Sequence, residues 1–145
     1  GNKDGFVGVG YAKARETVPA REKAYRKSKL NMIRIRRGCG SWKCSCKDHH
    51  SIPFKVVGKS GSSEITLMPA PKGKGLICDK EDAKNLERAG IKNVWSKSFG
   101  QKKNKINVIK ATMQALRKLS QLSVQDKHRE KLAITEGSVE VKAHD

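Results

Sequence analysis

Aromatic and acidic side chains are both scarce in this 145-residue chain. Phe, Trp and Tyr make up only 5% of the sequence, which argues against base stacking on single strands as the main mode of nucleic-acid binding. Only 14 acids accompany 32 Lys and Arg, so the formal net charge is +18 at pH 7. Self-repulsion of this kind destabilises a compact state unless a polyanion supplies counter-charge. Nucleic acid is the polyanion we expect, because its phosphates bind Lys and Arg.

The sequence also offers little to catalysis. We find no Ser-His-Asp set, no pair of carboxylates in an apolar stretch and no metal site with an open position, so we expect a protein that is not an enzyme. Residues 69–75 form a loop rich in Gly and Lys that lacks the G-x-x-x-x-G-K-[ST] pattern of a nucleotide-binding loop. We expect Lys72 and Lys74 to contact phosphates of a nucleic-acid backbone instead.

No apolar run approaches the length of about 20 residues that a membrane-spanning helix needs, and no signal peptide opens the chain. We therefore expect no membrane partner and a cytoplasmic location. Residues 1–5 are typical of a hairpin turn, yet no strand precedes them. This pattern indicates that the natural protein begins earlier and that its amino-terminal part is missing here.

Three of the four cysteines and two of the four histidines lie within thirteen consecutive residues. Cys39, Cys44 and Cys46 are followed by His49 and His50, either of which could complete a set of four metal ligands. Three thiolates and one imidazole are a common tetrahedral donor set for structural zinc. Metal binding would supply the ordering free energy that so polar a loop cannot gain by burial. Free thiols and a disulfide are the alternatives, and a reducing cytosol disfavours the disulfide.

Residue periodicity and capping residues predict alternating helices and strands. The expected helices span residues 18–29, 80–89 and 107–119, and the expected strands span residues 6–9, 30–37, 54–57, 65–68 and 91–98. Asp79 and Gly90 are the expected caps of the second helix, and Asn107 is that of the third. A turn at residues 58–62 predicts a hairpin, and Cys78 is expected to be a small buried residue.

Several separated blocks of the sequence, in order, resemble the fifth small-subunit ribosomal protein family. They are residues 1–10, Lys13-Ala14, and residues 30–33, 59–62, 67–76, 89–95 and 110–112. Residues 36–42, Arg-Arg-Gly-Cys-Gly-Ser-Trp, together with Lys110-Ala111-Thr112, are similar to the archaeal branch of this universal family. The resemblance covers residues 1–120.

The resemblance implies an α+β fold with two small domains. Residues 1–50 would form a truncated double-stranded-RNA-binding-like domain ending in the Cys/His loop, and residues 51–122 a ribosomal βαβ-type domain with two helices on a mixed sheet. Beyond this resemblance, mixed charge and poor patterning predict a solvated tail at residues 123–145, in which a short helix could form near residues 127–134. In that family the Cys-rich loop is followed by a histidine, a small residue, an aliphatic residue and Pro-Phe. His50-Ser51-Ile52-Pro53-Phe54 fits this order, which implies that His50, with the three clustered cysteines, holds the zinc.

The resemblance also implies a function and its partners. The chain would be a structural constituent of the small ribosomal subunit, binding its rRNA at the body–head junction near the mRNA entry path and supporting translational accuracy. Neighbouring small-subunit proteins would be further partners, and no small-molecule substrate is expected. Charge and resemblance together give a set of expected RNA-binding residues: Asn2, Lys3, Lys13, Arg15, Arg21, Lys23, Arg26, Lys27, Lys29, Arg34, Arg36, Arg37, Lys59, Lys72, Lys74, Lys97, Lys102 and Lys103.

Two other functions compete with this interpretation. A free zinc-dependent RNA-binding regulator would share the cluster and the charge, and sedimentation with small subunits in high salt would distinguish it. A small-molecule kinase is suggested by the fold implied for the second domain, and it predicts nucleotide binding by residues 69–76. A shared fold does not carry catalysis with it, so binding of ATP is the discriminating measurement.

Overall fold

The computed structural model describes residues 1–138 and has mixed helix and strand content, as the expected α+β class requires. The helices are α1 (Thr17–Leu30), α2 (Lys80–Ala89), α3 (Lys105–Gln121) and α4 (Asp126–Lys131). The strands are β1 (Phe6–Val7), β2 (Ile33–Arg34), β3 (Arg36–Arg37), β4 (Val56–Ser60), β5 (Ser63–Pro69), β6 (Leu76–Ile77), β7 (Val94–Phe99) and β8 (Thr135–Glu136).

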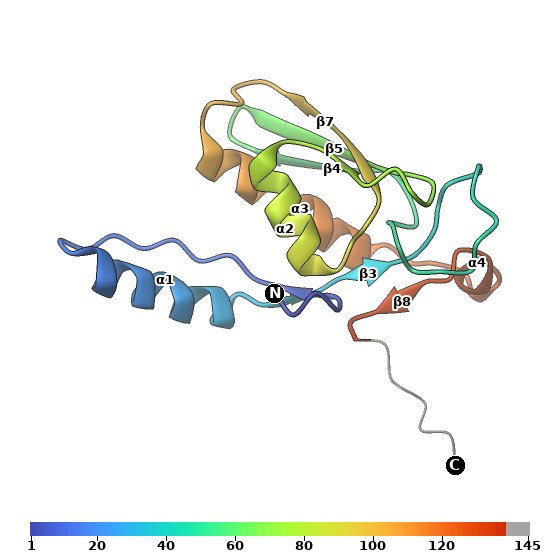
Figure 1. The fold of residues 1–145 in the computed structure, drawn as a ribbon, viewed down its shortest axis with the longest axis horizontal. Coiled ribbons are helices and arrows are strands. Elements are labelled where there is room, and N and C mark those ends of the chain that lie inside the picture. The colour runs from blue at the N-terminus through green and yellow to red at the C-terminus, as the bar shows by residue number, and fades with distance from the viewer. Residues whose placement is uncertain (139–145) are drawn as a thin grey trace, which may run out of the picture.

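A four-stranded sheet in the order β4-β5-β7-β6 organises the second half of the chain (Figure 1). β4 and β5 form the expected hairpin, and the pairing of Ser60 with Ser63 leaves a two-residue turn in which Gly61 has a φ of 61°. This turn is tighter than the expected loop of residues 58–62 because both strands extend into it. β6 lies at the sheet edge and is the only strand parallel to its neighbour among those described.

The core lies between this sheet and the helices α2 and α3. α3 buries one face, which includes Ala111, Ala115 and Leu116. α3 approaches β4 so closely at Gly58 that a Cβ there would lie 2.0 Å from the Ala111 carbonyl oxygen, so glycine is required for this packing. Close backbone contact of this kind fixes α3 firmly on the sheet.

A buried carboxylate links the two core helices. Asp82, in the first turn of α2, is fully buried, and the Thr112 hydroxyl of α3 donates to its Oδ1 at 2.5 Å. Its Oδ2 has no hydrogen-bond partner within residues 1–138. Burial raises the pKa of Asp82 to about 6, since desolvation disfavours the charged form.

α1 projects away from the sheet and is packed much less than the core helices (Figure 1). None of its residues is buried. Its inner side lies against the segment that contains Gly8 and Gly10, where a Cβ would collide with backbone atoms of Ser28 and Ala24 respectively. Ala20, Ala24 and Ser28 of α1 are therefore only partly buried.

Three distant segments meet around β3. β3 pairs with β8, so that Arg36 lies opposite Glu136 and forms an ion pair with it. Arg37 donates to Asp4 Oδ1 at 2.6 Å and to the Gly137 carbonyl at 3.0 Å. α4 is exposed, as a solvated tail with a short helix requires, but β8 is not part of such a tail, because Glu136 and Gly137 supply the partners of two buried guanidinium groups. Residues 139–145 of that tail lie outside the described residues.

Other expected boundaries also need correction. The single strand expected at residues 30–37 is two short strands, because α1 continues to Leu30 and Ile35 turns into the core between them. The strand expected at residues 91–98 begins at Val94, after the turn that Gly90 closes. Asn104 rather than Asn107 caps α3, since its side chain accepts from the Asn107 N–H at 3.4 Å.

Candidate metal centre and nucleic-acid interface

Backbone pairing closes the base of the Cys/His loop. Gly38 and Ser51 form an isolated antiparallel bridge with hydrogen bonds of 2.9 Å in both directions. Cys39 follows one paired residue and His50 precedes the other, so the bridge brings the first and last candidate ligands together. Gly40 packs so tightly that a Cβ there would lie 1.9 Å from a backbone oxygen, which explains why a glycine follows the first cysteine.

Three sulfur atoms and one imidazole nitrogen gather inside this loop. The donor atoms of Cys39, Cys44, Cys46 and His50 all lie within 4.8 Å of one another, and His49 is outside the group. Cys46 Sγ is 3.6 Å from Cys39 Sγ and 3.1 Å from His50 Nε2. Cys44 Sγ and Cys46 Sγ are 2.7 Å apart, and all four cysteines of the chain are free thiols. The four side chains could therefore hold a metal ion.

The thiols of Cys44 and Cys39 differ in pKa. The side chain of Cys46 and the backbone N–H of Lys72 lower the pKa of Cys44 to about 6 by hydrogen bonding. Burial raises the pKa of Cys39 to about 12. Metal ligation requires thiolates, so Cys44 is already suited to ligation near neutral pH, whereas Cys39 must release a proton.

The side chain of Asn93 contacts the imidazole of His50 at Nδ1, the ring nitrogen away from the sulfur atoms. Asn93 Nδ2 lies 2.9 Å from His50 Nδ1, and Asn93 Oδ1 accepts from the Gly75 N–H at 2.9 Å. Both side chains are buried. The amide leaves His50 Nε2 facing the sulfur atoms. Because Asn93 Nδ2 donates, Nδ1 accepts and the neutral ring carries its proton on Nε2. Metal binding through Nε2 would require the other tautomer, with Nδ1–H donating to the amide oxygen after the Asn93 side chain turns over.

The basic loop of residues 70–75 lies against the Cys/His loop. Lys72 Nζ is 2.7 Å from Asp48 Oδ2, and the backbone of Lys72 contacts Cys44. Both charged side chains of this ion pair are more than half exposed, so the pair adds little stability. The loop leads into strand β6 rather than into a helix, so it lacks the helix N-terminus that commonly binds phosphates in nucleotide sites.

Most residues expected to bind RNA are exposed. They are Asn2, Lys3, Lys13, Arg15, Arg21, Lys23, Arg26, Lys27, Lys29, Arg34, Lys59, Lys72, Lys74, Lys97, Lys102 and Lys103. Arg36 and Arg37 differ, being only 6% and 3% exposed and paired within the protein. In this fold both guanidinium groups serve the β3 junction, so the structure removes them from the candidate RNA surface.

α1 presents the clearest cationic face. Its charges are positive except for Glu22, and no ion pair between residues 1 and 138 involves the helix. Lys29 Nζ lies 4.6 Å from the centre of the Tyr25 ring. Cations without partners keep their full attraction for an external polyanion.

Sequence reasoning missed two kinds of residue. Asn93 carried no pattern that connects it to a loop more than forty residues earlier. Lys110 and Arg117 lie seven residues apart on the exposed side of α3, a helical spacing that could have revealed them.

Cys78, expected to be buried, is partly buried against the core and outside the metal cluster. Among residues 1–138, no helix is both long and apolar enough to span a membrane.

The chain matches two models of one protein family. Residues 1–36 match the model described as ribosomal protein S5, N-terminal domain, and residues 58–130 match ribosomal protein S5, C-terminal domain. These two ranges lie on either side of the Cys/His loop.

Similar proteins occur in several archaea. A protein of Methanocaldococcus jannaschii is 49% identical over 139 residues, covering 96% of this chain and 64% of its own length. A protein of Nanoarchaeum equitans is 50% identical over 139 residues, which cover 96% of this chain and 60% of that protein. A protein of Pyrobaculum aerophilum is 56% identical over 117 residues, which cover 81% of this chain and 54% of that protein. Each is named small ribosomal subunit protein uS5, and the chain spans between 54% and 64% of their lengths.

Proposed function

Because the chain belongs to the ribosomal protein S5 family, we propose that it is a structural constituent of the small ribosomal subunit that binds the subunit's RNA. The observation that carries the proposal is the identity of about half with archaeal proteins named as small-subunit components. The net charge of +18 supports it, since phosphate neutralisation would relieve the self-repulsion of the free chain. In this role the chain performs no catalysis and resides with the ribosome in the cytoplasm.

We further propose that phosphates bind along the exposed cations of α1 and of the basic loop at residues 70–75. Lysine and arginine contacts of this kind fix the position of a protein on RNA without reading its sequence. The first domain, residues 1–50, would then act as a double-stranded-RNA-binding-like unit, and residues 51–122 as the second. Contacts at the body–head junction near the mRNA path, and with neighbouring small-subunit proteins, complete the proposal.

Sedimentation tests this function. The chain is added to small subunits depleted of their own copy of the family's protein and centrifuged through a gradient in high salt. We expect it to sediment with the subunit, because a structural constituent is held by shape as well as by charge. A chain that stays at the top of the gradient, while still binding isolated RNA, would support the free RNA-binding regulator instead.

The metal that suits the Cys/His cluster is zinc. Zinc with bonds to sulfur of about 2.3 Å has tetrahedral edges of about 3.8 Å. The 3.6 Å distance between the sulfurs of Cys39 and Cys46 is close to this value, whereas the sulfurs of Cys44 and Cys46, 2.7 Å apart, would have to separate when zinc binds. Three cysteines and one histidine form a closed donor set, which is typical of a structural site. When bound, zinc would supply the ordering free energy of the loop.

Metal content by atomic emission, with thiol titration alongside, tests the zinc proposal. We expect about one zinc per chain and protection of the three clustered thiols. Replacing Cys44 and Cys46 by Ser should abolish metal binding and amide protection in residues 38–50 while α3 keeps its protection. Cys78→Ser, outside the cluster, is the matched control and should keep the metal. Four reactive thiols with no metal would overturn the proposal and leave the ribosomal function standing.

A further inference from the structure

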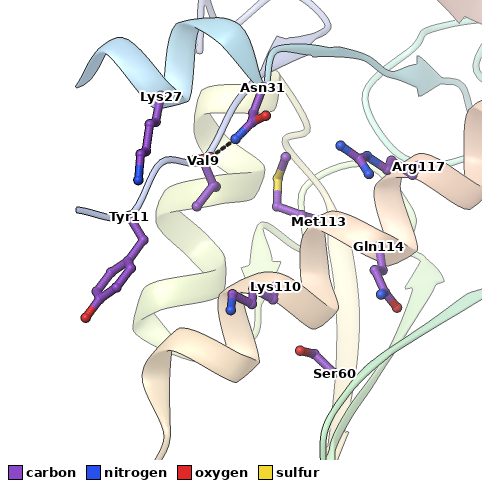
Figure 2. Close-up of a pocket in the computed structure, with 9 residues that line it drawn as sticks. All are labelled: Val9, Tyr11, Lys27, Asn31, Ser60, Lys110, Met113, Gln114 and Arg117. Atoms are coloured by element: carbon purple, nitrogen blue, oxygen red, sulfur yellow. Dashed lines mark hydrogen bonds between the residues drawn. The ribbon is translucent and has the colours of Figure 1, made fainter. Parts of the chain in front are cut away.

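A groove of about 410 Å³ lies between α1 and α3, away from the metal cluster (Figure 2). Val9 and Met113 contribute apolar surface to it, and Ser60 and Gln114 contribute polar side chains. A volume of this size falls within the range of sites that hold small ligands. Elements from both halves of the chain line the groove, so any occupant would touch both.

The charge of the groove has one sign. Lys27 of α1 and Lys110 and Arg117 of α3 line it, and no acid does. None of these three cations forms an ion pair with another residue in the range 1–138, whereas Lys3, Lys72, Lys84 and Lys105 elsewhere on the surface each contact an acid. The groove is therefore suited to an anionic occupant.

Tyr11 lies at the same groove and is 59% exposed. Figure 2 shows the Tyr11 side chain at the edge of the groove that Lys27 and Lys110 also line. An aromatic face flanked by cations is the combination that binds an unstacked base and its neighbouring phosphates. An acidic peptide would satisfy the cations but would leave the ring without a stacking partner.

We propose that this α1–α3 groove binds one unpaired nucleotide of an RNA strand. The base stacks on Tyr11, and the adjoining phosphates contact Lys27, Lys110 and Arg117. The proposal rests on the proposed RNA-binding function and adds a site that reads an unpaired nucleotide. It is compatible with the low aromatic content of the chain, since one ring serves one base.

The test compares a fully paired RNA duplex with the same duplex carrying one bulged purine, by fluorescence anisotropy at several salt concentrations. We expect the chain to bind the bulged duplex more tightly. Tyr11→Ala should remove this preference by weakening the bulged complex about 5-fold to 150-fold, the range for loss of one base–aromatic stack. Lys110→Ala and Arg117→Gln should each lower the salt slope by about 1.

Two control variants separate the groove from general effects. Tyr25→Ala removes a similarly exposed tyrosine of α1 that does not line the groove, and it should keep the preference for the bulge. Lys127→Ala removes an exposed cation on α4, outside the groove, and it should keep the preference for the bulge. Circular dichroism of each variant verifies that the fold is intact.

Three results would overturn the proposal. The first is equal affinity of the chain for the two duplexes. The second is an equal loss of affinity for the bulged duplex in Tyr11→Ala and in Tyr25→Ala. The third is displacement of the bulged RNA by a polyglutamate peptide to the same extent in wild type and in Tyr11→Ala. Failure of the chain to bind either duplex would instead contradict the proposed RNA-binding function, so the two failures are distinguishable.

Discussion

The two halves of this molecule are held together by different forces. The β4–β7 sheet with α2 and α3 contains most of the buried apolar side chains, and six residues of α3 are buried. α1 buries none, and the Cys/His loop and β3 depend on hydrogen bonds, ion pairs and the candidate metal. The comparison indicates that hydrophobic burial stabilises one half, while the other keeps its charges free for a partner and relies on polar junctions.

The largest effect should follow from a cavity in the sheet half. Leu116→Ala removes a fully buried side chain and should lower the free energy of unfolding by about 2–5 kcal/mol, because transfer and cavity costs add. Urea denaturation measures this change. Val18→Ala on α1, where the side chain is 61% exposed, should change it by less than about 0.5 kcal/mol. Similar losses in both variants would contradict the contrast between the halves.

Asp82 introduces a pH dependence into the hydrophobic half. Its pKa is about 6 in the folded chain and 3.8 ordinarily, so the folded state holds more protons between these values and stability falls as pH rises through this window. Asp82→Asn, which keeps an acceptor for Thr112, should gain up to about 3 kcal/mol relative to wild type between pH 4 and pH 7. Urea denaturation across this range measures it. Stability profiles of wild type and Asp82→Asn that run parallel over this pH range would be inconsistent with a raised pKa of Asp82. Asp79→Asn, at the exposed cap of α2, is the control.

A smaller effect should arise in the polar half from the residue behind the metal cluster. Asn93→Ala removes the amide beside His50 Nδ1, whose oxygen would accept from Nδ1–H when Nε2 holds zinc, and should weaken zinc affinity about 10-fold to 100-fold, the usual result of losing such a support. Competition with a chelator measures this affinity. Amide protection in α3 should stay as in wild type. Unchanged affinity would show that the Gly38–Ser51 bridge alone fixes His50.

The smallest effect on stability should accompany a clear effect on RNA. Arg26→Ala on α1 should alter the free energy of unfolding by less than about 0.5 kcal/mol, because the side chain is exposed and has no ion-pair partner in the described residues. It should reduce the salt slope of RNA binding by about 1. Arg26→Lys, which keeps the charge, should restore the slope. A large loss of stability would mean that α1 has a packing role.

Local patterns predicted the elements that depend on local chemistry. Gly61 and Gly90 marked a turn and a helix end, and the spacing of buried residues in α3 followed from its sequence alone. Cys39, Cys44, Cys46 and His50 were close enough in sequence to be recognised as one group. These features depend on residues within a few positions of one another.

Features that depend on distant partners could not be predicted. Arg36 belonged to the strand expected at residues 30–37, but that expectation could not reveal that Glu136 lies opposite Arg36. Asp82 resembled an ordinary first-turn acid, and only the packing of α3 against α2 buries it. Asn93 and the α1–α3 groove likewise arise from tertiary contacts that have no local pattern.

The junction at β3 has a consequence for the order of synthesis. Arg36 and Arg37 are each 100 residues earlier in the chain than their partners Glu136 and Gly137. At translation rates of about 5–20 residues per second, those partners follow after about 5–20 s. During this interval Arg37 already has Asp4 as an ion-pair partner, whereas Arg36 still lacks Glu136 and is a cation on a nascent chain, able to attract RNA phosphates. Arg36 therefore has an electrostatic role first and an architectural one once β8 is made.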